Sequence, residues 1–393
     1  MILQKAYKAK NVKVVCMQSG LFDKLLSLEK SQDKCKKSLA EFIDGKRRQF
    51  PRFYFMSEAD LLDLLSNSSS PQKVLVHVDK ILLATKQLNL QGTKGSDRPS
   101  ATEWVAGVGK ELVVFDTPLP LMGKAEQYLR DCLKAQIYTL SRLLSSSVAR
   151  YPQEPRIDWM MKKGENGETT DPAQIILLVA TMEYAKGVER AMKIYKDGDK
   201  AAIDKYYQKT LDGLGDLIAH TQNTLNKGDR QRTMCMITLD AHNRDILDDL
   251  MKDQAYRVND FQWQSKLRPK FLTETRNGAA TASIARFNIC DASFDYGFEY
   301  LGNGPRLVVT PLTDRIYVTA TQALNLHMGC APAGPAGTGK TETTKDLASA
   351  LGKCCYVFNC SPEMDYQSMG NIFKGLAASG SWGCFDEFNR LIP

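Results

Sequence analysis

The sequence predicts a mainly α-helical N-terminal region followed by an incomplete α/β domain of the P-loop type. Three observations lead to this prediction. Apolar residues recur at helical spacing through much of the first three quarters of the chain. The stretch 334–341 has the spacing G-x-x-x-x-G-K-T, which is typical of a loop that holds phosphate groups. An apolar run at 382–385 ends in the adjacent acids Asp386 and Glu387, which is typical of a strand that delivers carboxylates to a site.

Breaker residues divide the first part of the N-terminal region. A helix-rich part is expected up to about residue 90, and the polar stretch 91–100, with two glycines and a proline, predicts an exposed loop. The run 111–115 has strand character, and a long helix is expected over 123–149.

The second part of this region is again helical. The stretch 162–170 predicts another polar loop, and Asp171-Pro172 predicts the cap and first turn of the next helix. The segment 256–271 is expected to lead into a β-rich segment. The sequence therefore predicts a domain boundary near residue 290, which separates regions 1–290 and 291–393.

The elements around the glycine-rich loop follow in order. Two β-branched runs, 307–310 and 316–319, predict short strands ahead of it. A helix is expected over 340–351, with Gly352 placed for its C-terminal cap. The run 354–358 then predicts a buried strand.

A second crossover helix is predicted by apolar residues at intervals of three and four. These residues are Tyr366, Met369, Ile372, Phe373 and Leu376. With the strands 354–358 and 382–387 on either side, the order strand, helix, strand predicts a β-α-β unit.

The glycine-rich loop predicts an ATP site. Its residues are Gly334, Pro335, Ala336, Gly337, Thr338, Gly339, Lys340 and Thr341. Glycines let successive backbone N–H groups turn toward an anion. The ammonium of Lys340 is expected against the β- and γ-phosphates, and the hydroxyl of Thr341 on Mg²⁺. The alternative is a glycine-rich turn that matches the pattern by chance.

The adjacent acids predict a division of labour. Asp386 is expected to hold the metal, directly or through water, and Glu387 to orient and deprotonate the attacking water. The alternative is a surface turn that carries two solvated acids. The loop lies 46 residues upstream, from 340 to 386, and this spacing favours the catalytic interpretation.

The basic charge of the chain is concentrated at its start. Residues 1–50 carry twelve Lys or Arg and five Asp or Glu, which accounts for the whole formal charge of +7. Because the basic stretch 34–48 lacks a run of interleaved aromatics for base stacking, we favour a solvated helix face over a nucleic-acid site.

Composition argues against other classes of site. No stretch approaches the roughly 20 apolar residues of a membrane span. The ten cysteines show no paired metal spacing, which predicts reduced thiols in a cytosolic-type compartment. Cys354, Cys355 and Cys360 are therefore expected to be core residues, and the four histidines are expected to be structural.

Around these motifs the chain resembles dynein heavy chains. The segment 331–348 resembles the first AAA+ module of that family almost letter for letter, with 334–341 as its Walker A loop and 382–387 as its Walker B strand. Further matching segments are 298–302, 305–315, 357–360 and 384–390. The segment 50–57, with the leucines that follow it, resembles the dynein linker more loosely.

The resemblance implies a mainly α linker followed by an incomplete α/β P-loop (AAA+) domain, in an ATP-driven, minus-end-directed microtubule motor. It implies Lys340 and Glu387 as catalytic residues and ATP and Mg²⁺ as ligands. It also implies nucleotide contacts at Glu342 and adenine contacts near Leu307 and Val308. Implied partners are microtubules and dynein intermediate and light chains, reached through parts outside this sequence, in the axoneme of a cilium or flagellum, with no nucleic acid and no membrane.

The sequence departs from the family pattern in three places. Cys330 replaces a usual glycine, 275–283 looks diverged, as an insertion or an unusual turn, and the chain stops at Pro393. It is therefore expected to be a fragment, binding nucleotide weakly with negligible turnover. Two alternatives remain open: a non-catalytic assembly or interaction module, and an unrelated self-sufficient P-loop ATPase.

Overall fold

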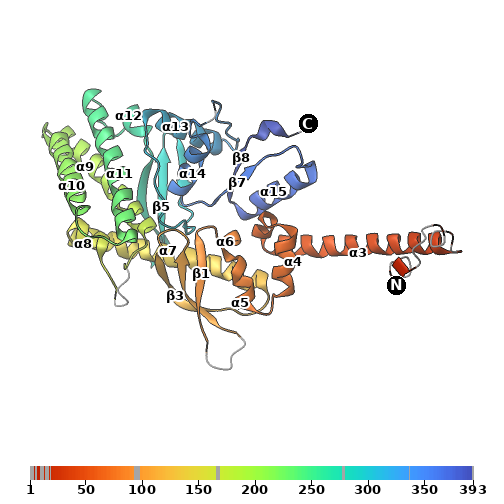
Figure 1. Ribbon diagram of the computed structural model, residues 1–393. Coiled ribbons are helices and arrows are strands. Elements are labelled where there is room, and N and C mark those ends of the chain that lie inside the picture. Colours follow the sequence, from red (N-terminus) through yellow and green to blue (C-terminus); the bar gives the residue numbers. More distant parts are fainter. Residues whose placement is uncertain are drawn as a thin grey trace.

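A long helix, α3, projects away from the body of the molecule (Figure 1). In this computed structural model, the described residues are 4, 7, 8, 13, 17, 19–92, 98–164, 169–276, 279–335 and 337–391, without the side chains of 274–283. Helix α3 spans Leu21–Gln49, and only Ile43 and Arg47 in it are buried. Its other lysines and arginines lie wholly or partly exposed, in keeping with the predicted solvated helix face.

Short helices and a three-stranded antiparallel sheet follow α3. The helices are η1 (Pro51–Phe55), α4 (Glu58–Ser66), α5 (Pro71–Val74), η2 (Leu75–His77) and α6 (Val78–Ile81). The strands are β1 (Thr85–Gln91), β2 (Ser100–Ala106) and β3 (Leu112–Pro120), in the order β1-β2-β3. The helix-rich prediction was wrong for β1, because Leu88 packs inward as part of a strand paired with β2. Of the predicted loop 91–100, residues 93–97 lie outside the described residues.

A bundle of longer helices forms the centre of the N-terminal region. These are α7 (Ala125–Arg150), α8 (Arg156–Met161), α9 (Ala173–Lys196), α10 (Ala202–His220), α11 (Lys227–Lys252) and α12 (Phe261–Gln264), with the turn η3 (Tyr151–Gln153). Helix α9 packs on α7, α10 and α11. The predicted role of Asp171 as a cap was wrong: Pro172 is the N-cap residue, and the buried Asp171 carboxylate pairs with Arg150.

A second antiparallel sheet joins the two regions. It consists of β4 (Arg268–Arg276), β5 (Ala279–Ile289) and β6 (Ala292–Asp295), in that order. Helix α9 lies on β4 and α13 lies on β6. The sheet therefore continues across residue 290, where the sequence placed the boundary. The diverged stretch 275–283 is the tip of the β4–β5 hairpin, with a register shift at Glu274 and Thr275 and residues 277–278 outside the described ones.

The C-terminal region contains the predicted β-α-β unit. Its elements are α13 (Pro311–Asn325), α14 (Lys340–Ala350), β7 (Cys355–Asn359), α15 (Tyr366–Ser379), β8 (Trp382–Asp386) and η4 (Phe388–Arg390). Strands β7 and β8 are parallel, with Asn359 opposite Asp386, and α15 is the crossover between them. Gly352 follows α14 at φ 64°, and a Cβ there would lie 2.6 Å from the Tyr296 ring, so the turn requires glycine.

The two strands predicted ahead of the loop were wrong. The run 307–310 has no regular structure, and 316–319 lies inside α13. Thr310 caps this helix with its side chain, and Pro311 occupies the first turn. A cap and an N-terminal proline override β-branched propensity, because they fix the backbone where a helix begins.

The cysteines of the C-terminal region pack largely as expected, and three tryptophans lie in the core. Cys354 and Cys360 are buried, whereas Cys355 is only partly so. Burial raises the pKa of Cys354 and of Cys355 to about 12, so both thiols stay protonated. Trp104, Trp159 and Trp263 are fully buried. No helix among the described residues is long and apolar enough to cross a bilayer.

Acid is expected to destabilise the fold through His242. Burial lowers the pKa of this imidazole, and Asp314 opposes the shift. Since the folded-state pKa then lies below that of the unfolded chain, the unfolded state gains the proton first, and stability falls as pH drops below the unfolded value of about 6.5. Urea unfolding on either side of this pH should show a smaller acid-induced loss for His242→Gln than for the parent chain. An equal loss in both chains would contradict this assignment.

Candidate nucleotide-binding site

The glycine-rich loop runs directly into the N-terminus of α14. Gly337 and Gly339 adopt φ 79° and 81°, in the left-handed region that favours glycine. Gly339 is the N-cap residue of α14, so the free backbone N–H groups of the first turn follow at once. A helix N-terminus with such a loop favours an anion. Ala336 lies outside the described residues.

The ammonium of Lys340 lies over this loop. Its Nζ donates to the carbonyl oxygens of Gly334 at 3.0 Å and Pro335 at 2.5 Å, and it lies 3.3 Å from Thr338 Oγ1. These three acceptors are groups that phosphate oxygens can replace. The structure thus places the Lys340 ammonium at the loop, and its contact with phosphate stays a prediction.

The fold brings Thr341, at the end of the glycine-rich loop, into contact with Asp386, at the end of the predicted acidic strand. Thr341 Oγ1 donates to Asp386 Oδ2 at 3.1 Å. Asp386 ends β8, which lies beside β7 and packs against α14. A hydroxyl and a carboxylate are oxygen donors of the kind that Mg²⁺ takes together with substrate phosphates. The donor set thus fits Mg²⁺, although no group of three or more His, Cys, Asp and Glu among the described residues could hold a metal unaided.

Glu387 follows Asp386 in the chain, but its carboxylate has a different partner. Its backbone adopts φ 54°, and its carboxylate pairs with Arg390 Nε at 2.9 Å. Its side chain is half exposed. The left-handed backbone turns the chain sharply between the two acids, so Asp386 and Glu387 point to different partners.

The remaining predicted nucleotide contacts are not gathered at the loop. Glu342 is exposed and pairs with Lys345 at 2.7 Å. Val308 is 70% exposed, while the Leu307 N–H points to Asp346 Oδ1 at 3.5 Å.

Sequence reasoning missed the cluster that anchors this segment. Asp346 accepts a hydrogen bond from the Tyr317 hydroxyl at 2.6 Å and lies 3.7 Å from Arg306 Nε. Burial and the Asp346 carboxylate raise the pKa of Tyr317, which keeps its hydroxyl a donor. Asp346 thereby ties 306–307 and α13 to α14. The only available signal was one acid on the helix that follows the loop, which does not indicate such a role.

Aromatic rings connect the N-terminal region to the strand that carries Asp386. The ring of Phe55 in η1 lies 3.9 Å from that of Tyr356 and 6.1 Å from that of Phe358, measured between centroids. Phe358 stacks on Phe385 at 5.4 Å, and Phe385 immediately precedes Asp386. A continuous row of rings therefore runs from η1 to the candidate metal ligand.

Polar contacts hold η1 in the same place. Arg52 and Glu299 form a buried ion pair, with 4% and 10% of their side chains exposed. The carbonyl oxygen of Ile81 accepts from Arg52 Nη1 at 3.2 Å and from the Tyr356 hydroxyl at 3.1 Å. The N-terminal region is thus fixed to β7 and to the segment after β6.

Family models match both regions. A model described as the hydrolytic ATP binding site of dynein motor region matches residues 296–392. A second, described as dynein heavy chain, N-terminal region 2, matches residues 1–147.

Individual relatives match nearly the whole chain. The dynein alpha chain of the flagellar outer arm of Chlamydomonas reinhardtii is 48% identical over 394 residues, which cover 100% of this chain and 8% of that protein. The human dynein axonemal heavy chain 17 is 42% identical over 395 residues, which cover 99% and 8%. The ciliary dynein beta chain of Tripneustes gratilla is 41% identical over 385 residues, which cover 98% and 8%. The chain therefore spans about a twelfth of the length of these relatives.

Proposed function

The chain belongs to the dynein heavy-chain family, and on this premise we propose that it contains the ATP-hydrolysing site of an axonemal microtubule motor. Region 1–290 then corresponds to part of the linker, and region 291–393 to the N-terminal half of the first AAA+ module. The observation that carries the proposal is the contact between Thr341 and Asp386 at 3.1 Å, beside a lysine that lies over the glycine-rich loop.

Each residue of the site has a proposed role in ATP hydrolysis. The backbone N–H groups of 334–339 and the Lys340 ammonium hold the β- and γ-phosphates. Thr341 and Asp386 hold Mg²⁺, which neutralises charge on the phosphate oxygens when it is bound. Glu342, Leu307 and Val308 are proposed to contact the nucleoside part of ATP.

Water activation is assigned to Glu387. Its carboxylate accepts a proton from the water that attacks the γ-phosphorus, and the bond from that phosphorus to the bridging oxygen of ADP breaks. To reach the water, the carboxylate has to leave its ion pair with Arg390. That pair is largely exposed, so its loss costs little, on the order of 0–1 kcal/mol.

The row of rings gives the N-terminal region a route to the site. A shift of β8 that accompanies nucleotide binding moves Phe385, and through Phe358 it reaches Phe55 in η1. We therefore propose that hydrolysis at Asp386 and Glu387 is coupled to movement of the linker part of the chain. Microtubules, intermediate chains and light chains are proposed partners of the whole protein in the axoneme.

Removal of the Lys340 ammonium is expected to abolish most nucleotide binding. A hydrogen bond to a charged group is worth about 1.5–3 kcal/mol, so Lys340→Ala should weaken MgATP binding by at least about tenfold. The measurement is titration of the 393-residue chain with a fluorescent ATP analogue. Lys374→Ala, which removes an exposed lysine of α15, is the matched control and should bind as the parent chain does.

Turnover by the same chain is expected to be negligible. The family resemblance implies an arginine from a neighbouring module, and such a residue is worth roughly 10³–10⁵ in rate. Steady-state phosphate release should therefore stay at background in the parent chain and in Glu387→Gln. Robust turnover that Glu387→Gln abolishes would indicate a self-sufficient ATPase instead. No MgATP binding by the parent chain would indicate a non-catalytic assembly module.

A further inference from the structure

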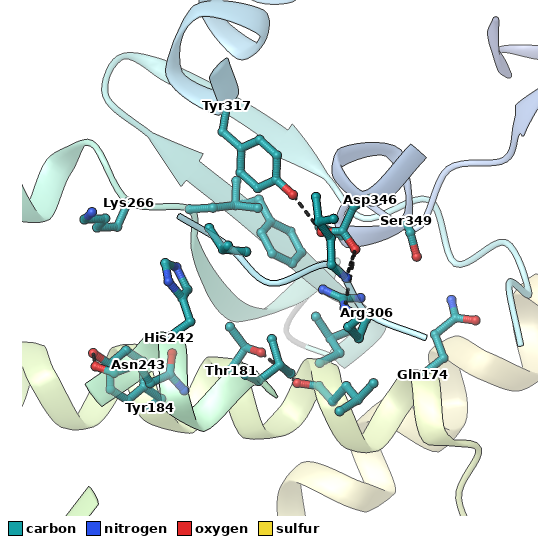
Figure 2. A pocket seen from close by; sticks show the side chains of 18 of the residues that line it. Gln174, Thr181, Tyr184, His242, Asn243, Lys266, Arg306, Tyr317, Asp346 and Ser349 are labelled. Atoms are coloured by element: carbon teal, nitrogen blue, oxygen red, sulfur yellow. Dashed lines mark hydrogen bonds and ion pairs between the residues drawn. The ribbon is translucent and has the colours of Figure 1, made fainter. Parts of the chain in front are cut away.

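A cavity of about 540 Å³ lies where the N-terminal helices meet the C-terminal domain. Figure 2 shows its lining: α9 and α11 form one side, and α13, α14 and the segment 301–309 form the other. Among the described residues that line it, none belongs to the glycine-rich loop 334–341. Its volume is in the range of small-molecule sites, about 300–1,000 Å³.

Most of the cavity wall is apolar. Side chains from α9, α11, β5 and the 301–309 segment supply this surface: Leu177, Leu178, Leu239, Ile246, Phe287 and Leu307. These side chains belong to separate elements that face one another across the space. An apolar ligand fits between them, because contact with it removes the apolar surface of these side chains from water.

One charged group in the lining is left under-compensated. Lys266 has Asp314 at 2.5 Å and Lys345 has Glu342 at 2.7 Å, and Arg268 Nη2 donates to Gln264 Oε1 at 2.6 Å. Among the described residues, the Arg306 guanidinium has only Asp346 as an ion-pair partner, at 3.7 Å from its Nε, and that carboxylate also accepts from the Tyr317 hydroxyl.

The terminal nitrogens of Arg306 are available to a ligand. Within the described part of the chain we find no hydrogen bond to them, and the side chain is 20% exposed. Figure 2 shows Arg306 beside Asp346 in the cavity lining. A guanidinium fixed on one edge by a carboxylate presents its other edge in the geometry that binds carboxylate, sulfonate or phosphate oxygens.

We propose that this cavity binds a small flat apolar molecule that carries one anionic group. The apolar body lies between α9 and α11 on one side and Phe287 and Leu307 on the other, and the anionic group accepts from Arg306. The ligand contacts the N-terminal helices and α14 together, and α14 begins at Lys340.

The test uses 1-anilinonaphthalene-8-sulfonate, a flat aromatic monoanion whose fluorescence rises in apolar sites, titrated into the full chain. Saturable binding at one site is expected. Arg306→Gln should weaken it by about tenfold or more, because a charge-assisted hydrogen bond is lost. The neutral analogue N-phenyl-1-naphthylamine should bind the parent chain and Arg306→Gln equally. Arg315→Gln, on the exposed face of α13, is the matched control and should bind the sulfonate like the parent chain.

Larger side chains that fill the cavity test whether the dye binds inside it. Thr181 lines it from α9 and Ser349 from α14, so Thr181→Trp and Ser349→Trp, each checked for cooperative thermal unfolding, should both block the dye. Lys340→Ala should leave dye binding in place, because none of the described lining residues belongs to the loop 334–341. Equal sulfonate binding by Arg306→Gln and the parent chain, dye binding that survives both tryptophan variants, or loss of dye binding in Lys340→Ala would each overturn the proposal.

Discussion

Replacement of Arg52 by methionine is expected to lower the free energy of unfolding by about 3–5 kcal/mol, because it leaves a buried carboxylate without its partner. The Glu299 side chain is only 10% exposed. Arg52 also donates to the Ile81 carbonyl at 3.2 Å, so that acceptor loses one of its two donors. Urea unfolding of Arg52→Met beside the parent chain measures the effect.

Two further variants distinguish the cost of leaving a charge buried from the cost of losing an ion pair in general. Lys252→Met breaks an exposed pair with Asp248, whose side chains are 65% and 42% exposed, and should cost less than about 1 kcal/mol. The double variant Arg52→Met with Glu299→Leu should regain much of the loss, since two apolar side chains leave no buried charge. A double variant as unstable as Arg52→Met would mean that the loss comes from packing rather than from charge.

Two glycines of α15 are expected to respond to alanine in opposite directions. A Cβ on Gly375 would lie 2.6 Å from Tyr54 Cβ and 2.9 Å from the Phe55 ring. Gly375→Ala should therefore force α15 away from η1 and destabilise the chain by about 1–3 kcal/mol. At Gly370 nothing lies within 4 Å of an added Cβ, so Gly370→Ala should stabilise the chain by about 0.5–1 kcal/mol, through the better helix propensity of alanine.

The pair is informative because both positions lie inside the same helix. Thermal unfolding of the two variants under one set of conditions gives the sign of each change. If both alanines stabilise the chain, the close approach of α15 to η1 does not exist in solution. If both destabilise it, the glycines serve the helix itself rather than this contact.

Local sequence patterns predicted the C-terminal β-α-β unit well. The loop and α14 could be recognised because glycines, a lysine and the following apolar spacing are all set within a few residues. The same holds for α15, whose apolar residues keep helical intervals, and for β8, which ends at Asp386, one residue before the predicted end at Glu387.

The errors arose where a neighbouring residue or a distant partner decides the structure. The run 316–319 is β-branched, yet Thr310 and Pro311 start a helix ahead of it. Strand β1 has mixed polarity and becomes a strand by pairing with β2. The assignments of Lys340, Thr341, Asp386 and Glu387 as site residues remain predictions, although the fold brings Thr341 and Asp386 into contact.

Contacts between the two regions could not be predicted from the sequence. The Arg52–Glu299 pair joins residues 247 positions apart, and no periodicity relates them. The same applies to Gly375, whose lack of a side chain is explained only by Tyr54 and Phe55 on the opposing surface.

The projecting helix α3 has a mechanical consequence. It has 29 residues, and at a rise of 1.5 Å per residue such a helix is about 44 Å long. It leaves the body of the molecule next to η1 (Figure 1), whose rings and backbone pack on α15 and β7. A tilt of about 10° at this root would swing the far end by about 8 Å. A helix of this length therefore enlarges any small tilt at its root, beside α15 and β7, into a larger displacement at its far end.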